Sequence, residues 1–462
     1  MNFNLHIKNV GKLSDAKIRI GRFTVLAGPN NTGKSFVSKI VYSFFNAMNA
    51  NHAEVHINNL TDSLSTDIDN LLGFIEESEE FLSPLQKEID ILHNLVMKCP
   101  VGDSGELEKI IPALVKKAHK MREMYPDIIS PLEDAVYNIV GYEDEIWGPF
   151  RGYSHSLKLS LINLEKNLNN TNAIKFIISG IEYEIRENLI RNFQIPNLAD
   201  LKGTEEMSSQ VYIKDFGTFE FLNGNIEFEI GDSLLRKFQQ LSNVIYVESP
   251  VYWKLKNALE DLRIRPRYTL SGRERLSGVP GYFYDLASAL KSEYTGDMAF
   301  PNVHKKLTGK EVLGGKVVIS DSGALLFQEN GRSFSLPVTA MGVANLGVLA
   351  LLIERKILDR ESFLFIDEPE AHLHPSWQVV MAEALFELAK GGANVVIATH
   401  SADILKWLEV HIKKHPEDEK LVALNKFPAN GDESIEQDFD HKIAAIKQEL
   451  TKPFADLYTA GL

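Results

Sequence analysis

The chain has 462 residues, of which 44% are hydrophobic, and its 63 acidic and 49 basic side chains give a formal net charge of −14. A chain of this length is typical of about three domains of ~150 residues each. Such an acidic chain cannot coat nucleic acid over its whole surface, because DNA phosphates are bound by clustered Lys and Arg side chains. Any contact with DNA therefore requires a local basic patch.

Cys99 is the only cysteine, which excludes a disulfide framework and a Cys-based metal site and favours a reducing compartment. The N-terminal residues lack the charged segment and the long apolar segment of a signal peptide. The longest apolar stretch, residues 340–353, contains Asn345 and is shorter than the ~18 residues of a membrane span. We expect a cytoplasmic protein with no membrane contact, in which residues 340–353 form a buried helix.

The N-terminal part of the chain predicts strands followed by a helix. Residues 3–8, 15–20 and 23–27 are short, rich in β-branched and aromatic side chains, and separated by glycines. From Ser35 to Met48, apolar side chains recur at helical spacing. This order predicts a buried strand that leads through a short loop into a helix.

Residues 56–205 predict an inserted helical domain, because helical patterning alternates there with long polar stretches. Proline removes a helix hydrogen-bond donor and clashes with the preceding turn, so we expect a compact bundle of short helices and no long coiled coil. The prolines concerned are Pro84, Pro100, Pro112, Pro126, Pro131, Pro149 and Pro196.

Strand patterns return after residue 205. Residues 210–230 alternate around an Asn223-Gly224 turn, and residues 244–247 and 316–327 are further strand candidates.

The last third of the chain is predicted to be α/β. Apolar runs at residues 363–366 and 394–398 flank a helical pattern at residues 376–390. A strand, a crossover helix and a second strand of this length imply parallel strands in one sheet.

Residues 28–35 fit the phosphate-binding loop pattern of Gly, four residues and Gly-Lys-Ser. The glycines let backbone N–H groups approach phosphates, Lys34 reaches the β and γ oxygens, and the Ser35 hydroxyl ligates Mg²⁺. The alternative is a glycine-rich turn without a nucleotide, but the loop follows a predicted strand and opens a predicted helix, as phosphate binding requires. The predicted nucleotide-binding residues here are Gly28, Pro29, Asn30, Asn31, Thr32, Gly33, Lys34, Ser35 and Phe36.

Asp367 and Glu368 directly follow the apolar run at residues 363–366, and ligands of open α/β sheets bind at the carboxyl ends of strands. We expect Asp367 to hold Mg²⁺ and Glu368 to polarise the attacking water as general base. A pair of acids after a strand can also be a helix cap. The phosphate-binding loop elsewhere in the chain favours the catalytic interpretation.

His400 ends the next apolar strand, within Thr399-His400-Ser401. A histidine opposite a γ-phosphate can hydrogen-bond both that phosphate and the water. For an isolated strand-end histidine the ordinary interpretation is a half-buried imidazole. The two preceding motifs favour a catalytic role.

Together, residues 28–35, 363–375 and 399–401 resemble the Walker A, Walker B with D-loop, and switch-histidine motifs of the ABC-type ATPase superfamily. More closely, they resemble the branch that includes the ATPase domains of OLD nucleases, RecF and the SMC-like proteins. The resemblance implies an α/β fold, namely an ABC-type P-loop head with a mixed sheet and flanking helices. That head is discontinuous, over residues 1–55 and 206–462, with the helical domain of residues 56–205 inserted. It further implies a homodimer or higher oligomer that sandwiches ATP head to tail, each site being completed by the partner's signature loop.

Two segments are candidates for that signature. Residues 270–275 lie far upstream of Asp367, whereas residues 339–345 open the apolar helix that leads into the Walker B strand. Position favours the second, so Gly342 is predicted to contact the nucleotide through a helix N-terminus. The serine usual in the signature is missing, with Ala340 and Met341 in its place, so we expect slow hydrolysis.

The densest basic run lies between residues 263 and 275, and its first three arginines alternate, so their guanidinium groups can line one edge. The alternatives are a solvated or intersubunit salt-bridged loop and a contact with a nucleic-acid backbone. The arginines are Arg263, Arg265, Arg267, Arg273 and Arg275. His372 and His374 suggest a zinc pair, but no third ligand at helical spacing accompanies them.

The motifs are shared by several classes of protein, and other features of the sequence distinguish between them. The helical insertion argues against a transporter subunit, and a P-loop kinase would not need the acidic and Thr-His-Ser motifs. OLD nucleases carry a C-terminal TOPRIM nuclease domain, and the stretch after Ser401 is too short for one. Resemblance to the ATPase subunits of two-gene phage-defence systems such as Septu and PARIS implies an ATPase that controls a separate effector protein, such as a nuclease. The alternative is a DNA repair or recombination ATPase of the RecF and SMC-like type.

Overall fold

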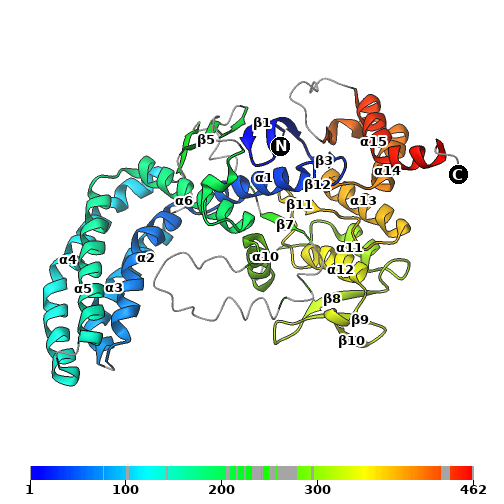
Figure 1. Cartoon of the computed structure of the whole chain (residues 1–462). Coiled ribbons are helices and arrows are strands. Elements are labelled where there is room, and N and C mark those ends of the chain that lie inside the picture. Colours follow the sequence, from blue (N-terminus) through cyan, green and yellow to red (C-terminus); the bar gives the residue numbers. More distant parts are fainter. Residues whose placement is uncertain are drawn as a thin grey trace. The chain divides into compact units, whose positions relative to one another are not determined.

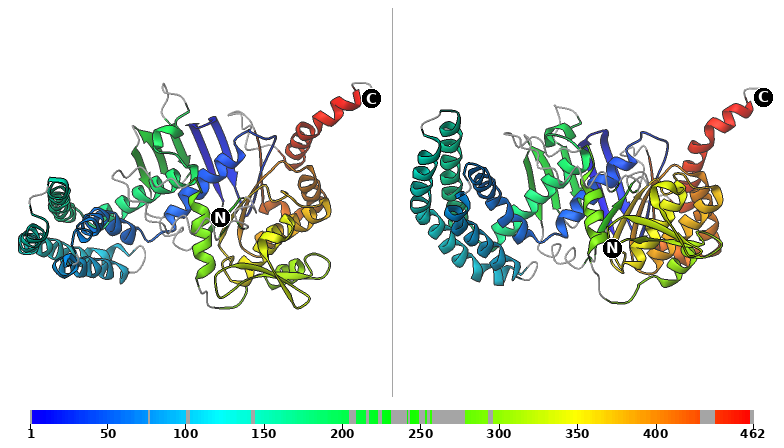
Figure 2. Two further views of the ribbon diagram at one scale, coloured as in Figure 1. Left: turned by 60° about the horizontal axis from the view of Figure 1, so that its bottom comes forward. Right: turned by 90° about the horizontal axis from the view of Figure 1, so that it is seen from below.

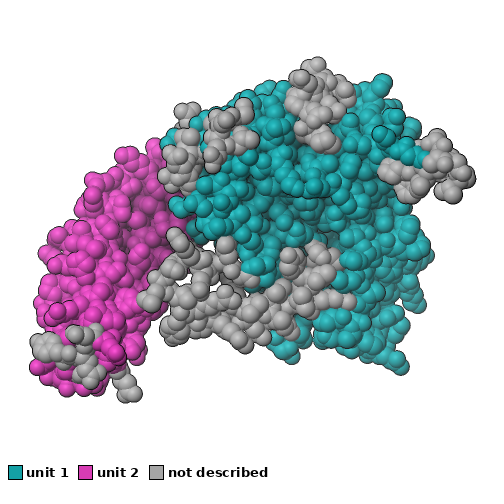
Figure 3. All heavy atoms as spheres, viewed as in Figure 1, with its two compact units in different colours: residues 1–49, 186–462 teal, residues 50–185 magenta. Residues whose placement is uncertain are grey.

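The computed structural model divides the chain into two compact units, unit 1 with residues 1–49 and 186–462 and unit 2 with residues 50–185 (Figures 1 and 3). The sequence predicted domain boundaries at 55/56 and 205/206, and the structure has them at 49/50 and 185/186. The difference is larger at the second boundary. There the end of helix α6 (Ala173–Phe193) packs within unit 1, where Asn192 Nδ2 donates to Ser43 Oγ at 2.9 Å. The structure describes residues 2–75, 77–99, 103–141, 144–203, 209–214, 217–222, 225–230, 241, 243–248, 253, 256, 278–292, 296–427 and 438–459.

Within its described residues, unit 2 consists of helices joined by short turns. Within it, α2 packs against α3 and α5, and α4 packs against the same two helices (Figure 2). α6 crosses from unit 2 into unit 1 at Arg186. The helices are α2 (His52–Leu72), α3 (Ser78–Met97), α4 (Ser104–Val140), α5 (Asp144–Asn169) and α6 (Ala173–Phe193).

The expectation of short helices broken at prolines is wrong. α4 runs continuously through three prolines, Pro112, Pro126 and Pro131. All three are exposed, so water can hydrate the carbonyls that lack a helical N–H partner. The apolar face of α4, with residues such as Leu114 and Met121, is fully buried. Packing of that face outweighs the local cost of each proline.

Unit 1 contains an antiparallel sheet of five strands in the order β2-β1-β4-β5-β6. Its blue and green strands lie side by side in Figure 2. Buried side chains alternate with more exposed ones over residues 3–9 of β1 and 16–20 of β2, the pattern of a sheet with one face against a core. The strands are β1 (Phe3–Val10), β2 (Leu13–Ile20), β4 (Ser209–Ile213), β5 (Gly217–Leu222) and β6 (Asn225–Ile230).

The second sheet of unit 1 is parallel, in the order β13-β3-β12-β11-β7. β3, β11 and β12 are buried along their whole length, as expected for a parallel sheet covered on both faces. The parallel pairing predicted for the last third is confirmed. The strands are β3 (Phe23–Ala27), β7 (Val244–Val247), β11 (Phe363–Asp367), β12 (Asn394–Thr399) and β13 (Val422–Lys426).

Helix α1 (Lys34–Met48) links the two sheets through its aromatic side chains. The Phe44 ring lies 4.5 Å from that of Phe219 in β5, and the Phe45 ring lies 5.0 Å from that of Phe363 in β11. Burial of each such ring stabilises the fold by about 1.5–3 kcal/mol. The C-terminal part of α1 is thereby held against both sheets.

A three-stranded sheet, β10-β9-β8, and further helices complete unit 1. The predicted buried helix at residues 340–353 is confirmed as α12, whose residues from Ala344 to Ile353 are all buried. No helix within the described residues combines the length and apolar character needed to cross a membrane. The elements are β8 (Gly315–Ile319), β9 (Leu325–Glu329), β10 (Arg332–Ser335), α10 (Gly281–Lys291), α11 (Pro301–Thr308), α12 (Met341–Glu354), α13 (Pro375–Lys390), α14 (Ala402–Lys414), α15 (Phe439–Thr459) and the 3₁₀ turns Leu198–Leu201, Leu336–Val338 and Pro416–Leu421.

Candidate nucleotide site

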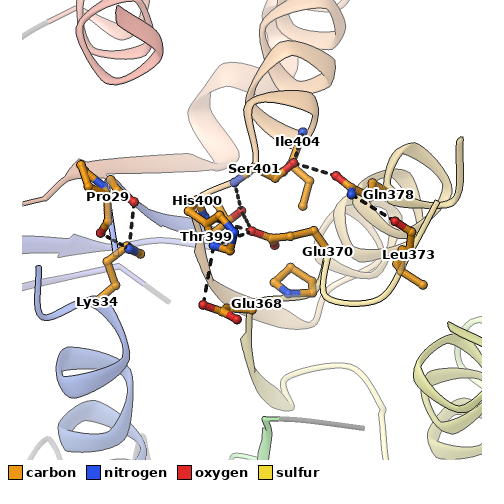
Figure 4. A network of polar contacts seen from close by, with 12 residues as sticks. Pro29, Lys34, Glu368, Glu370, Leu373, Gln378, Thr399, His400, Ser401 and Ile404 are labelled. Atoms are coloured by element: carbon orange, nitrogen blue, oxygen red, sulfur yellow. Dashed lines mark hydrogen bonds and ion pairs between the residues drawn. The ribbon is translucent and has the colours of Figure 1, made fainter. Parts of the chain in front are cut away.

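Strand pairing brings the predicted site residues to one edge of the parallel sheet. β12 lies between β3 and β11, and the register pairs Thr399 with Ala27 and Asp367 with Ala398. The loop after β3, the acids after β11 and His400 after β12 therefore share the carboxyl edge (Figure 4). This is the edge at which open α/β sheets bind ligands.

The loop between β3 and α1 depends on two glycines. A Cβ atom on Gly28 would lie 2.1 Å from the Phe427 carbonyl oxygen, so only glycine fits where the loop passes the chain after β13. Gly33, at the N-cap of α1, has φ 98°, a left-handed value that glycine adopts at little cost. These positions let the loop turn back over the start of α1.

Lys34 lies folded into this loop. Its Nζ donates to the carbonyl oxygens of Gly28 at 2.8 Å and Pro29 at 2.6 Å (Figure 4). Burial lowers the pKa of the Lys34 ammonium, and the charges of Asp367 and Glu368 act in the opposite direction. A phosphate in the loop would offer this ammonium a charged acceptor in place of carbonyl groups.

Asp367 is 7% exposed and ends the buried strand β11. It accepts a hydrogen bond from the Ser35 hydroxyl, and its Oδ2 lies 3.5 Å from the Tyr246 hydroxyl. Its Oδ1 is buried and has no hydrogen-bond partner among the described residues. Burial raises the pKa of Asp367 to about 6. A buried carboxylate oxygen without a partner, beside a serine hydroxyl, fits a hard divalent cation such as Mg²⁺.

Glu248 is a neighbour of Asp367 that the sequence analysis missed. It follows β7, the strand next to β11, and its charge adds to the raised pKa of Asp367. Lys39 of α1 pairs with Glu248 at 2.9 Å, and the Tyr282 hydroxyl also donates to Glu248. An acid directly after a buried strand, the signal used for Asp367, was available for Glu248 as well.

Glu368 and His400 face one another beside Lys34 and Asp367. Glu368 has φ 51° and donates its N–H to the Ala398 carbonyl at 2.8 Å, which turns its side chain out of the strand. Both side chains are partly exposed, at 48% for Glu368 and 40% for His400, and His400 Nδ1 lies 3.6 Å from Glu368 Oε1. Their accessibility suits groups that act on a bound substrate.

Glu370, which sequence reasoning missed, holds the strand end that carries His400. Its side chain is 5% exposed, and Oε1 accepts from the Thr399 hydroxyl at 2.7 Å and from the His400 N–H at 2.9 Å (Figure 4). His400 Nδ1 lies 3.4 Å from the same oxygen. Glu370 is the second glutamate of Asp-Glu-Pro-Glu, so the motif itself could have drawn attention to it. Its role was not visible in the sequence because its partner Thr399 lies on another strand.

A second set of hydrogen bonds joins the segment after β11 to the segment after β12. Gln378 in α13 donates to the Leu373 carbonyl at 3.2 Å and accepts from the Ser401 hydroxyl at 2.8 Å. Ser401 Oγ in turn accepts from the Ile404 N–H at 3.2 Å and caps α14 (Figure 4). These bonds join α13 and the segment before it to the start of α14, which follows His400.

Gly342 lies at the start of α12. A Cβ atom there would lie 3.1 Å from the His372 carbonyl oxygen, and Asn345 Nδ2 donates to the Pro369 and Ala371 carbonyls, each at 3.3 Å. The start of α12 thus packs against the segment after Asp367. Gly342 is not among the described residues that line the pocket at the loop.

Other predicted residues have structural roles or fall outside the described ranges. His374 Nδ1 accepts from the Ser376 N–H at 3.3 Å and caps α13. The alternative signature at residues 270–275 and the arginines at 263–275 lie outside the described residues.

A pocket of about 330 Å³ opens beside the loop and α1. Three lysines and a single glutamate are the charged residues among its described lining, a balance that favours a polyanion. The lining consists of Lys12, Asn30, Asn31, Thr32, Gly33, Lys34, Ser35, Phe36, Lys39, Phe193 and Glu368.

These features are those of a P-loop ATPase, and comparison with known proteins gives its family. Residues 1–405 match the AAA ATPase domain family, so the chain belongs to that family. The predicted α/β class and the resemblance to ATPases are confirmed.

Individual relatives are similar over short stretches or at low identity. The Old nuclease of Escherichia phage P2 is 48% identical over 44 residues, which cover 10% of this chain and 8% of that protein. An SMC head bound to the C-winged helix domain of ScpA is 10% identical, with a TM-score of 0.35 and coverage of 88% of this chain and 92% of that chain. A Smc head domain with an extended coiled coil, from Pyrococcus furiosus, is 11% identical, with a TM-score of 0.28 and coverage of 91% and 99%.

Proposed function

We propose that this protein binds ATP with Mg²⁺, closes a head-to-tail homodimer, hydrolyses ATP slowly and thereby controls a separate effector, a nuclease, in prokaryotic anti-phage defence. The observation that carries the ATPase part is the convergence of Lys34, Asp367, Glu368 and His400 at one sheet edge. Membership of the AAA ATPase domain family supports the same reaction.

Binding of the triphosphate rests on the loop and on α1. Backbone N–H groups at the start of α1 and the ammonium of Lys34 suit the β- and γ-phosphates. Ser35 and Asp367 would hold Mg²⁺, and the bound ion would neutralise part of the phosphate charge. The unpartnered, buried Oδ1 of Asp367 supports this assignment.

Hydrolysis requires a general base and a group that stabilises charge at the γ-phosphate. Glu368 is turned out of β11 and accessible, so it can accept a proton from the attacking water. His400 lies within 3.6 Å of the Glu368 carboxylate and can hydrogen-bond the γ-phosphate. Glu370 holds the His400 backbone, so the imidazole enters the reaction from a fixed strand end.

The test of the reaction is ATP turnover measured by phosphate release. Lys34→Ala is expected to abolish binding, whereas Glu368→Gln is expected to keep binding and to lose at least a hundredfold in kcat, the low end for loss of a general base. Glu383→Gln changes a partly exposed acid of α13 that pairs with Lys306. It is the control and should leave turnover unchanged. Unchanged turnover in Glu368→Gln would contradict the assignment.

Dimerisation is tested with the same variants. Glu368→Gln with ATP is expected to sediment as a dimer and to return to the ATP-free state when ATP is removed. The signature region around Gly342 lacks the usual serine, so the wild-type protein is expected to turn over slowly. Rapid steady-state turnover, or a mass independent of nucleotide, would contradict this part of the proposal.

Control of an effector is tested by expressing the chain together with its genomic neighbours. The expected result is a co-purifying protein whose release depends on ATP and changes in Glu368→Gln. If none co-purifies and the chain binds DNA, the DNA repair or recombination alternative is favoured. In that case replacing Arg263, Arg265 and Arg267 with Ala should weaken DNA binding and flatten its salt dependence.

A further inference from the structure

The pocket beside the phosphate-binding loop is lined on one part by aromatic side chains, which have no role in binding phosphates. Phe36 and Phe193 are the only aromatic or aliphatic side chains among its described lining residues. Their ring centroids lie 4.8 Å apart at an interplanar angle of 55°. Both rings are partly exposed rather than buried, so part of each remains accessible to a ligand.

The Phe36 ring is seated on the turn between β1 and β2. Gly11 has φ 55°, and a Cβ atom there would lie 2.2 Å from Phe36 Cζ, so the absence of a side chain makes room for the ring. Phe36 directly follows Ser35 in α1. The ring therefore lies next to the residues that we assign to the phosphates and Mg²⁺.

Phe193 is the last residue of α6, and neighbouring contacts fix its position. Asn192 donates to Ser43 Oγ at 2.9 Å and accepts from the Tyr282 N–H at 3.0 Å. Arg191 pairs with Asp285 at 3.0 Å. The end of α6 is thus fastened to α1 and α10, and the Phe193 ring is presented from a rigid element.

The two kinds of wall match the two parts of a nucleoside triphosphate. The phosphates need N–H donors and cations, which the loop, Lys12, Lys34 and Lys39 supply. A nucleobase is flat and apolar on its faces and gains by stacking on aromatic rings. In the described lining only the two phenyl rings offer such a surface.

We infer that Phe36 and Phe193 form a stacking surface for the base of the bound nucleoside triphosphate. This inference rests on the proposed function, since it assigns the base of the same ligand. Stacking uses the face of the base and not its hydrogen-bonding edge, so the surface favours the larger purines over pyrimidines. Phe193 also makes the end of α6 part of the nucleotide pocket.

The test compares Mg-ATP with inorganic tripolyphosphate, which carries the phosphates without the base. Phe193→Ala is expected to raise the Kd for Mg-ATP about tenfold, the effect of losing one ring under a base, and to leave the Kd for tripolyphosphate unchanged. Phe193→Tyr, which keeps the ring, should bind both as the wild type does. Titration calorimetry measures both constants on the full chain.

Each alternative outcome is informative. If Phe193→Ala binds ATP as well as the wild type, or weakens both ligands equally, the stacking surface is refuted while the proposed function stands. If the wild-type protein binds neither ATP nor tripolyphosphate, the proposed function itself is refuted, and the stacking surface with it. A stronger effect on ATP than on UTP would further support the inference.

Discussion

The buried carboxylate of Glu370 gives a sharp test of how the strand end at His400 is held. Glu370→Ala removes an acceptor that serves two donors, the Thr399 hydroxyl at 2.7 Å and the His400 N–H at 2.9 Å. Thr399 is fully buried, so water cannot readily replace the lost oxygen. The variant leaves both donors without their acceptor in a region of low exposure.

The magnitude follows from these contacts. Each buried donor left unpaired costs about 1–3 kcal/mol. Glu370 Oε2 is itself buried without a hydrogen-bond partner among the described residues, and removal of that unpaired oxygen offsets part of the cost. We therefore expect Glu370→Ala to lower the free energy of unfolding by about 2–4 kcal/mol. Glu370→Gln keeps the Oε1 acceptor and should cost at most about 1 kcal/mol.

A double-mutant cycle with Thr399→Val isolates the interaction. The valine removes the hydroxyl that Glu370→Ala would leave unpaired, so the double variant should be less destabilised than the sum of the single variants by about 1 kcal/mol or more. Urea unfolding followed by circular dichroism measures all four proteins. Single effects that add to within about 0.5 kcal/mol would refute the reasoning, as would equal loss in Glu370→Gln and Glu370→Ala.

Two further predictions concern other parts of the chain. Gly28→Ala should prevent folding of the loop or lower the melting temperature in calorimetry, because the new Cβ would lie 2.1 Å from the Phe427 carbonyl oxygen. Gly148→Ala is the control, since no atom lies within 4 Å of its Cβ position, and it should leave the melting temperature unchanged or raise it. Burial lowers the pKa of His56 from 6.5 to about 4, so the native state binds fewer protons than the unfolded state at pH 5. The contribution of His56 to the free energy of unfolding should therefore fall by about 2 kcal/mol between pH 7.5 and pH 5. In urea titrations at the two pH values the wild type should lose about 2 kcal/mol more than His56→Phe, whatever the other titrating groups contribute to both proteins. A fall of the same size in the variant would contradict the assignment to His56.

Local pattern was sufficient to predict the residues that the fold brings together at one sheet edge. The loop of residues 28–35 could be identified because its chemistry fixes residue types at consecutive positions, and Asp367, Glu368 and His400 because each follows an apolar run of strand length. The same reasoning failed for α4, since proline propensity describes a helix in isolation. Burial of one continuous apolar face kept that helix intact with its prolines in solvent.

The residues that the sequence did not reveal are those whose meaning depends on distant partners. Glu370 matters through Thr399, Glu248 through Asp367, and Phe193 through Phe36, and each pair is far apart along the chain. No periodicity or motif spacing encodes such a pair. Only the folded chain assigns these side chains to the site.

The sequence by itself determined the α/β character of unit 1, and it singled out the candidate phosphate-binding loop, the acids after β11 and the histidine after β12. It did so because strand, loop and helix signals are local and the residue types are fixed by phosphate chemistry. The tertiary structure decided that β12 lies between β3 and β11. That order depends on hydrogen bonding between β3, near the N-terminus, and β12, in the last third of the chain. It brings three separate motifs together at one candidate site.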